Sequence, residues 1–119
     1  GTAVLFGYVK KYRIKMAWGT DILFSEAQAR RQGVLLAAMT RWFTPAETLQ
    51  MATATNGELL ALSGLRSPYK GRLGVVEEGA LADLLLVDGN PLADISIVAD
   101  PERNFRVIMK DGKVYKNSL

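Results

Sequence analysis

The hydrophobic pattern of this chain changes from helical to strand-like at Gly64, and this change limits the folds that it can adopt. Before Gly64, apolar residues recur mainly with the spacing of helices that pack on a core. After it, they form short runs separated by Gly, Asp and Pro, which indicates strands and tight turns. The chain has 119 residues, of which 49% are apolar and 23% charged, as in a small globular domain or part of a larger one. We therefore divide it into a helical half, residues 1–64, and a β-rich half, residues 65–119.

The helical half is expected to begin with a short helix and a strand. Apolar residues from Val4 to Tyr12 form one helical stripe. Apolar and other residues then alternate over 14–18, which predicts a strand that ends at Gly19. An apolar start of this kind leads us to expect that the chain is a segment of a longer protein.

Two longer helices are expected next. Ser25 can cap a helix over 25–43, and Thr44 and Glu47 have the spacing of a capping box at the start of a second helix. This second helix is expected over 44–63, with a bend near Asn56–Gly57 and a left-handed stop at Gly64.

Short apolar runs in the β-rich half predict strands and turns. The clearest signal is Asp111–Gly112, which is typical of a two-residue hairpin turn between strands over 106–109 and 114–115. Further apolar runs lie at 73–76 and 84–87, and residues 94–97 are compatible with one helical turn. Trp18, Trp42 and Phe43 are expected in the core.

Histidine and cysteine are both absent. This excludes disulfides, a Ser-His-Asp triad and a His- or Cys-based zinc site formed by this chain alone. No apolar run approaches the ~20 residues that span a bilayer, and no signal-peptide pattern is visible. We expect no membrane partner and favour a cytoplasmic over a secreted location, with the compartment itself left open.

Positive charge gathers near the start of the chain, at Lys10, Lys11, Arg13 and Lys15. A nucleic-acid surface would combine such a cluster with aromatic residues on one face. The net charge is only +3, and a solvated helix end explains the cluster more simply. We therefore expect no nucleic-acid partner.

Asp21 is the candidate functional residue. It follows the expected strand directly after Gly19 and Thr20, and α/β folds place functional groups at such strand ends. Its carboxylate could bind a divalent metal or accept a proton from water, although an ordinary turn or cap role is also compatible with this position. Glu77–Glu78 are interpreted as a turn, Asp83 as structural at a strand edge, and Asp88 as a loop residue without the ligands of a calcium site.

Three blocks of sequence, in the same order, resemble the carboxy-terminal part of the amidohydrolase superfamily. They are residues 14–21 (IKMAWGTD), residues 44–64 (TPAETLQMATATNGELLALSG), and residues 71–91 (GRLGVVEEGALADLLLVDGNP) together with 107–115 (VIMKDGKVY). Within the superfamily, the imidazolonepropionase-like and Xaa-Pro-dipeptidase-like enzymes are the most similar branch.

The resemblance implies a fold and an activity. The family fold is a metal-dependent (β/α)₈ barrel beside a small β-sandwich. Residues 1–64 would be the end of the barrel, with residues 14–18 as its eighth strand, and residues 65–119 would be the carboxy-terminal segment of the sandwich. Asp21 would bind Zn²⁺ or another divalent metal and act as general base in the hydrolysis of a C–N bond, in an amide or dipeptide-like substrate.

The resemblance also implies that this chain is inactive on its own. The family's remaining metal ligands are His residues and often a carboxylated Lys on earlier strands, and this chain has no His. We expect the chain alone to bind no zinc tightly and to associate with the remainder of a parent enzyme or with itself. The alternative is a standalone, non-catalytic binding or oligomerisation module derived from the same fold.

Overall fold

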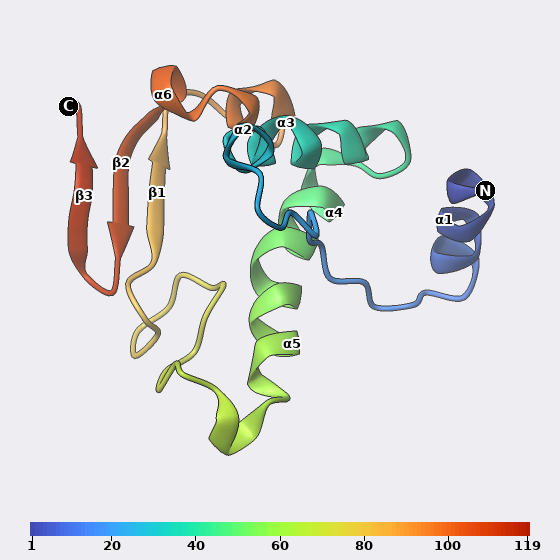
Figure 1. Ribbon diagram of the computed structural model, residues 1–119, viewed down its shortest axis with the longest axis horizontal. Coiled ribbons are helices and arrows are strands. Elements are labelled where there is room, and N and C mark those ends of the chain that lie inside the picture. Colours follow the sequence, from blue (N-terminus) through green and yellow to red (C-terminus); the bar gives the residue numbers. More distant parts are fainter.

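A computed structural model describes residues 1–119 and shows a helical part and a small antiparallel sheet (Figure 1). The helical elements are α1 (Thr2–Lys11), α2 (Glu26–Ala29), α3 (Gln32–Ala37), the 3₁₀ turn η1 (Ala38–Arg41), α4 (Pro45–Gln50), the π-helical segment η2 (Met51–Thr55), α5 (Asn56–Ala61) and the 3₁₀ turn η3 (Gly64–Arg66). The β-rich half contains β1 (Leu84–Val87), the 3₁₀ turn η4 (Ile95–Ala99), α6 (Pro101–Asn104), β2 (Phe105–Lys110) and β3 (Lys113–Asn117).

The capping box at Thr44 is confirmed. The Thr44 amide donates to the Glu47 carboxylate at 2.7 Å, and the Glu47 amide donates to the Thr44 hydroxyl at 3.2 Å. These contacts satisfy donors that have no partner within the helix. From this start, α4, η2 and α5 run as one continuous rod to Ala61, and Gly64 follows with a φ of +54° as expected of a left-handed stop.

The prediction of one continuous helix over 25–43 is wrong, because the structure divides this range into separate elements. The Ser25 cap is present, since its hydroxyl accepts the Gln28 amide, but a turn at residues 30–31 separates α2 from α3. The turn directs α3 toward η4, where a Cβ on Gly33 would collide with the Val98 carbonyl. This contact joins positions far apart in the sequence, so local periodicity could not reveal it.

The strand expected over residues 14–18 is also absent. These residues belong to a link between α1 and α2 that pairs with no other strand (Figure 1). A strand is stabilised by hydrogen bonds to a neighbouring strand, and none lies beside this segment. Residues 73–76 likewise form no strand. The structure therefore contains helices and a three-stranded sheet, and the barrel itself is not confirmed.

The sheet has the order β1-β2-β3, with all neighbours antiparallel. The expected hairpin joins β2 to β3, and Asp111 and Gly112 have φ values of +48° and +74°. Asp83, just before β1, accepts the Asp111 amide at 2.6 Å, and its other carboxylate oxygen lies 3.7 Å from the Lys110 ammonium. The predicted structural role of Asp83 is thus confirmed, since it anchors the hairpin tip.

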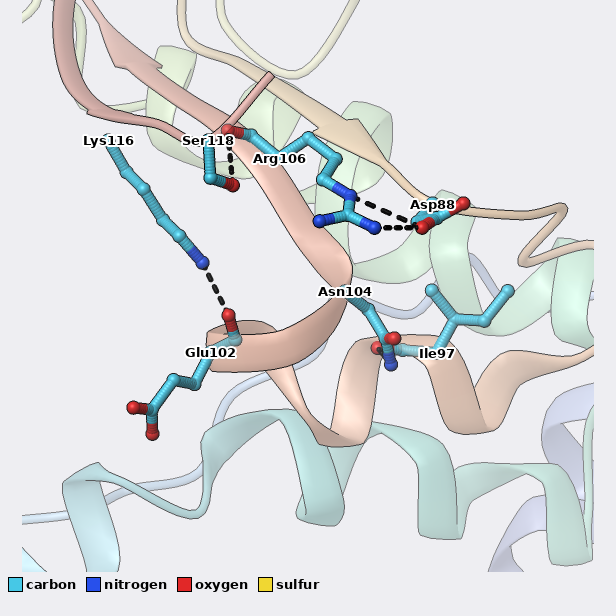
Figure 2. Close-up of polar contacts among 7 residues, drawn as sticks. All are labelled: Asp88, Ile97, Glu102, Asn104, Arg106, Lys116 and Ser118. Atoms are coloured by element: carbon cyan, nitrogen blue, oxygen red, sulfur yellow. Dashed lines mark hydrogen bonds and ion pairs between the residues drawn. The ribbon is translucent and has the colours of Figure 1, made fainter.

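Polar contacts also fix the other end of the sheet (Figure 2). The Arg106 guanidinium on β2 pairs with Asp88, directly after β1. The Lys116 ammonium on β3 donates to the Glu102 carbonyl of α6 at 2.6 Å, and the Ser118 hydroxyl donates to the Arg106 carbonyl at 3.3 Å. Asp88 therefore ties β1 to β2 across the strand ends.

Few side chains are fully buried. The buried residues are Phe43, Thr48, Met51, Gly57 and Val98, while Trp18 and Trp42 are only partly buried. The Phe6 ring of α1 contacts Trp42 and Phe43 edge-on, at centroid distances of 5.0 and 5.1 Å. The exposed surface is 8762 Å², compared with about 6,300 Å² for a compact protein of this mass. The fold therefore leaves much apolar surface uncovered, including Leu65 and Phe24.

Candidate active-site loop

Asp21 lies in the loop between α1 and α2 and is exposed. Its φ is +50°, in the left-handed region that costs energy for residues other than Gly but is better tolerated by Asp than by most. Gly19, two positions earlier, has open space around it. The loop thus presents the Asp21 carboxylate to solvent.

The segment that leads into this loop is held at Trp18 by the side chain of Asn56. The Trp18 amide donates to Asn56 Oδ1 at 3.0 Å, and Asn56 Nδ2 donates to the Trp18 carbonyl at 2.9 Å. Asn56 Nδ2 also lies 3.3 Å from the Ala52 carbonyl in the preceding turn. The helical pattern predicted only a bend near Asn56–Gly57, and no sequence pattern indicated this contact between Asn56 and Trp18.

The metal-ligating capacity of the chain is small. No group of three or more His, Cys, Asp or Glu side chains lies close enough together to hold a metal ion. Catalytic zinc sites usually use three protein ligands, so Asp21 alone does not form such a centre. The residues of this chain therefore do not fit a complete metal site, and we derive no reaction step through a metal.

Most other carboxylates already have structural partners. The turn expected at Glu77–Glu78 is present, since the Ala80 amide donates to the Glu77 carbonyl at 3.2 Å, and the Glu77 carboxylate pairs with Arg72. Hydrogen bonds from Ser96 lower the pKa of Asp94, which caps η4. The backbone hydrogen bond from Thr44 is the main cause that lowers the pKa of Glu47. These groups have structural partners, and none points to a second catalytic site.

A cleft of about 760 Å³ lies between the helical half and the sheet. Its walls include Trp18, Gly33 and Leu49 on one side, and Leu85 and Phe105 on the other. Asp21 does not line this cleft, so this apolar cleft and the candidate carboxylate do not coincide. The cleft belongs to the contact between the two halves of the chain.

No helix of the structure combines the length and the hydrophobicity that crossing a membrane requires.

Comparison with known proteins finds likeness among solved structures. No protein-family model matches the sequence, and no curated protein matches it. A crystal structure of an amidohydrolase is 33% identical, with a TM-score of 0.81, over 98% of this chain and 26% of that one. An uncharacterized protein (29% identity, TM-score 0.79) and a prolidase complexed with N-methylphosphonate-L-proline (28%, 0.80) match over the same shares.

The matches cover nearly all of this chain, at identities of 28% to 33%. The chain spans about a quarter of the length of these structures. Two of them are hydrolases by description, an amidohydrolase and a prolidase. The chain therefore resembles part of an amidohydrolase-superfamily enzyme.

Proposed function

We propose that this chain is the carboxy-terminal segment of a metal-dependent amidohydrolase that hydrolyses C–N bonds in amide or dipeptide-like substrates. The observation that carries the proposal is the likeness to a solved amidohydrolase, with 33% identity and a TM-score of 0.81 over 98% of the chain. Likeness to a prolidase complexed with a proline-containing phosphonate favours Xaa-Pro dipeptides as the first substrates to test.

We assign Asp21 the roles of general base and of one ligand to Zn²⁺ or another divalent metal in the complete enzyme. A carboxylate can accept the proton of an attacking water, and an exposed loop position leaves Asp21 accessible to substrate. The remaining ligands would come from residues outside this chain, since a single carboxylate is one ligand of the usual three. On this proposal the chain alone is inactive.

The exposed apolar side chains favour the proposal that a large partner covers part of this chain. The chain exposes about 2,400 Å² more than a compact protein of its mass, as much as a substantial protein interface buries. The occupant that we propose is the remainder of the parent enzyme. The same surface also supports the alternative, in which the chain is a non-catalytic oligomerisation module that covers its apolar faces with further copies of itself.

Hydrolysis by the complete protein tests the catalytic proposal. The gene that encodes residues 1–119 is expressed with its full reading frame, and Xaa-Pro dipeptides are assayed with and without added Zn²⁺ or Mn²⁺. The Asp21→Asn variant should lose about 10³-fold or more in kcat/KM, since it removes a base and a ligand together. Asp88→Asn is the matched control, because Asp88 is an exposed carboxylate paired with Arg106, and it should retain activity. Near-normal turnover in Asp21→Asn would overturn the assignment.

The size of the native particle separates the two alternatives. If residues 1–119 purify as a defined oligomer with a cooperative thermal transition, the oligomerisation module is supported. If the chain alone aggregates or binds a hydrophobic dye while the complete protein does neither, the proposal that the chain is a segment of a larger enzyme is supported.

A further inference from the structure

We propose that Asn56 is a positioning residue for Asp21, and this inference rests on the proposed function of Asp21. The Asn56 carboxamide takes the place of a neighbouring strand at Trp18 and so fixes the start of the loop that carries Asp21. It acts on the main chain at Trp18 and has no assigned contact with a substrate.

The geometry is that of a peptide pairing with a peptide. A carboxamide carries an acceptor oxygen and donor hydrogens close together, as one peptide group of a strand does. Asn56 uses both toward the same residue, at 3.0 Å to the Trp18 amide and 2.9 Å to the Trp18 carbonyl. The two residues are 38 positions apart, so this contact is tertiary.

These are the only hydrogen bonds to the main chain of residues 15–24. No backbone–backbone hydrogen bond involves that segment. The other polar contact of the segment joins the Lys15 ammonium to Glu58 and leaves the main chain free. Since Asp21 follows Trp18 after Gly19 and Thr20, the path of the chain to Asp21 starts from one fixed point, which Asn56 supplies.

Asn56 is itself held on a rigid support. The neighbouring Gly57 is buried so closely against the Leu73 carbonyl that a Cβ there would collide with it. Gly74 has the reciprocal relation to the Thr53 carbonyl. The helix and the loop at 73–74 are therefore in backbone-to-backbone contact beside Asn56. The π-helical segment η2 ends directly before Asn56, and such segments occur frequently at functional sites.

Two substitutions separate the hydrogen bonds from the shape of the side chain. Asn56→Leu keeps a similar volume and removes both bonds to Trp18. Asn56→Asp keeps the acceptor for the Trp18 amide and loses the donor to the Trp18 carbonyl. The matched control is Asn104→Leu, because Asn104 is also a partly buried Asn that donates to a backbone carbonyl, that of Ile97, at 3.0 Å (both drawn in Figure 2).

The first measurement is hydrogen exchange of the Trp18 amide in the complete protein. Asn56→Leu should accelerate exchange about tenfold or more, since it removes two hydrogen bonds to Trp18 and each bond of ordinary strength changes an equilibrium by about fivefold. Asn56→Asp should retain much of the protection of the Trp18 amide, and Asn104→Leu should leave it unchanged. Unchanged exchange in Asn56→Leu would overturn the proposal without reference to any activity.

The second measurement is hydrolysis of an Xaa-Pro dipeptide by the same variants. Misplacement of a catalytic group lowers kcat while ground-state binding is kept, so Asn56→Leu should lose about 10- to 100-fold in kcat with KM within twofold of wild type. Asn56→Asp should recover part of that loss, whereas Asn104→Leu should keep the wild-type kcat. Faster exchange with unchanged kcat would overturn the positioning role. Full activity of Asp21→Asn would instead overturn the proposed function of Asp21, and the positioning role with it.

Discussion

Replacing Gly57 by Ala tests the close contact between α5 and the loop at 73–74. An added Cβ would collide with the carbonyl oxygen and carbon of Leu73, which are backbone atoms and cannot rotate away. Overpacking of this kind costs about 1–3 kcal/mol, and the rigid neighbours place this case toward the upper end. Ala is favoured over Gly in a helix by about 1 kcal/mol. The net expectation is a loss of about 2 kcal/mol in the free energy of unfolding.

Gly7→Ala is the matched control for this experiment. Gly7 also lies within a helix, α1, but nothing beyond that helix's own backbone comes within 4 Å of the position of its Cβ. The preference for Ala over Gly in a helix is then the only effect of the substitution. Gly7→Ala should therefore raise the free energy of unfolding by about 0.5–1 kcal/mol. Urea unfolding followed by circular dichroism measures both variants. With a slope of about 1–3 kcal/mol per molar, Gly57→Ala should move the midpoint down by about 1 M. A Gly57→Ala protein as stable as wild type would show that the close approach of the Leu73 carbonyl does not exclude a Cβ at this position.

Three further predictions concern other parts of the chain. Thr48→Val should raise the melting temperature, because the Thr48 hydroxyl is fully buried without a hydrogen-bond partner and Val has nearly the same shape. A lower melting temperature in Thr48→Val would contradict this prediction. The Glu47 pKa lies below its ordinary value of 4.5, so its carboxylate stabilises the fold above that pH and this contribution disappears as pH falls through the folded-state pKa. The difference in stability between wild type and Glu47→Gln should therefore be largest above about pH 4.5 and shrink in acid, as measured by denaturant titration at several pH values. Residues 1–119 alone should show no sub-micromolar zinc site in calorimetry after chelator treatment, and one tightly bound zinc per chain would contradict the single-ligand assignment.

Local signals predicted local structure. The Thr44–Glu47 capping box, the Asp111–Gly112 turn and the strand β1 follow from residues that are adjacent or a few positions apart, and all three are present. Their energetics depend mainly on neighbouring backbone groups, which the sequence displays directly.

Contacts between distant positions could not be predicted in the same way. The break between α2 and α3 accompanies the approach of Gly33 to the Val98 carbonyl, and the missing strand at 14–18 depends on which neighbours the fold provides. The Asn56 contact with Trp18 joins two segments that are far apart in the sequence, and hydrophobic periodicity describes each segment only by itself. For the candidate site, the sequence predicted Asp21 from its position after Gly19 and Thr20. The role of Asn56 in holding the chain at Trp18 could be seen only in the structure.

The large exposed surface has a consequence for how sharply the chain unfolds. An unfolded chain of this mass exposes about 19,000 Å², so the structure removes about 10,000 Å² from water, roughly a fifth less than a compact protein of equal mass would. The dependence of unfolding on denaturant and the heat-capacity change both scale with that area. Both should be about a fifth smaller than the chain length suggests, which gives a broader transition, and both should rise when a partner covers the apolar faces.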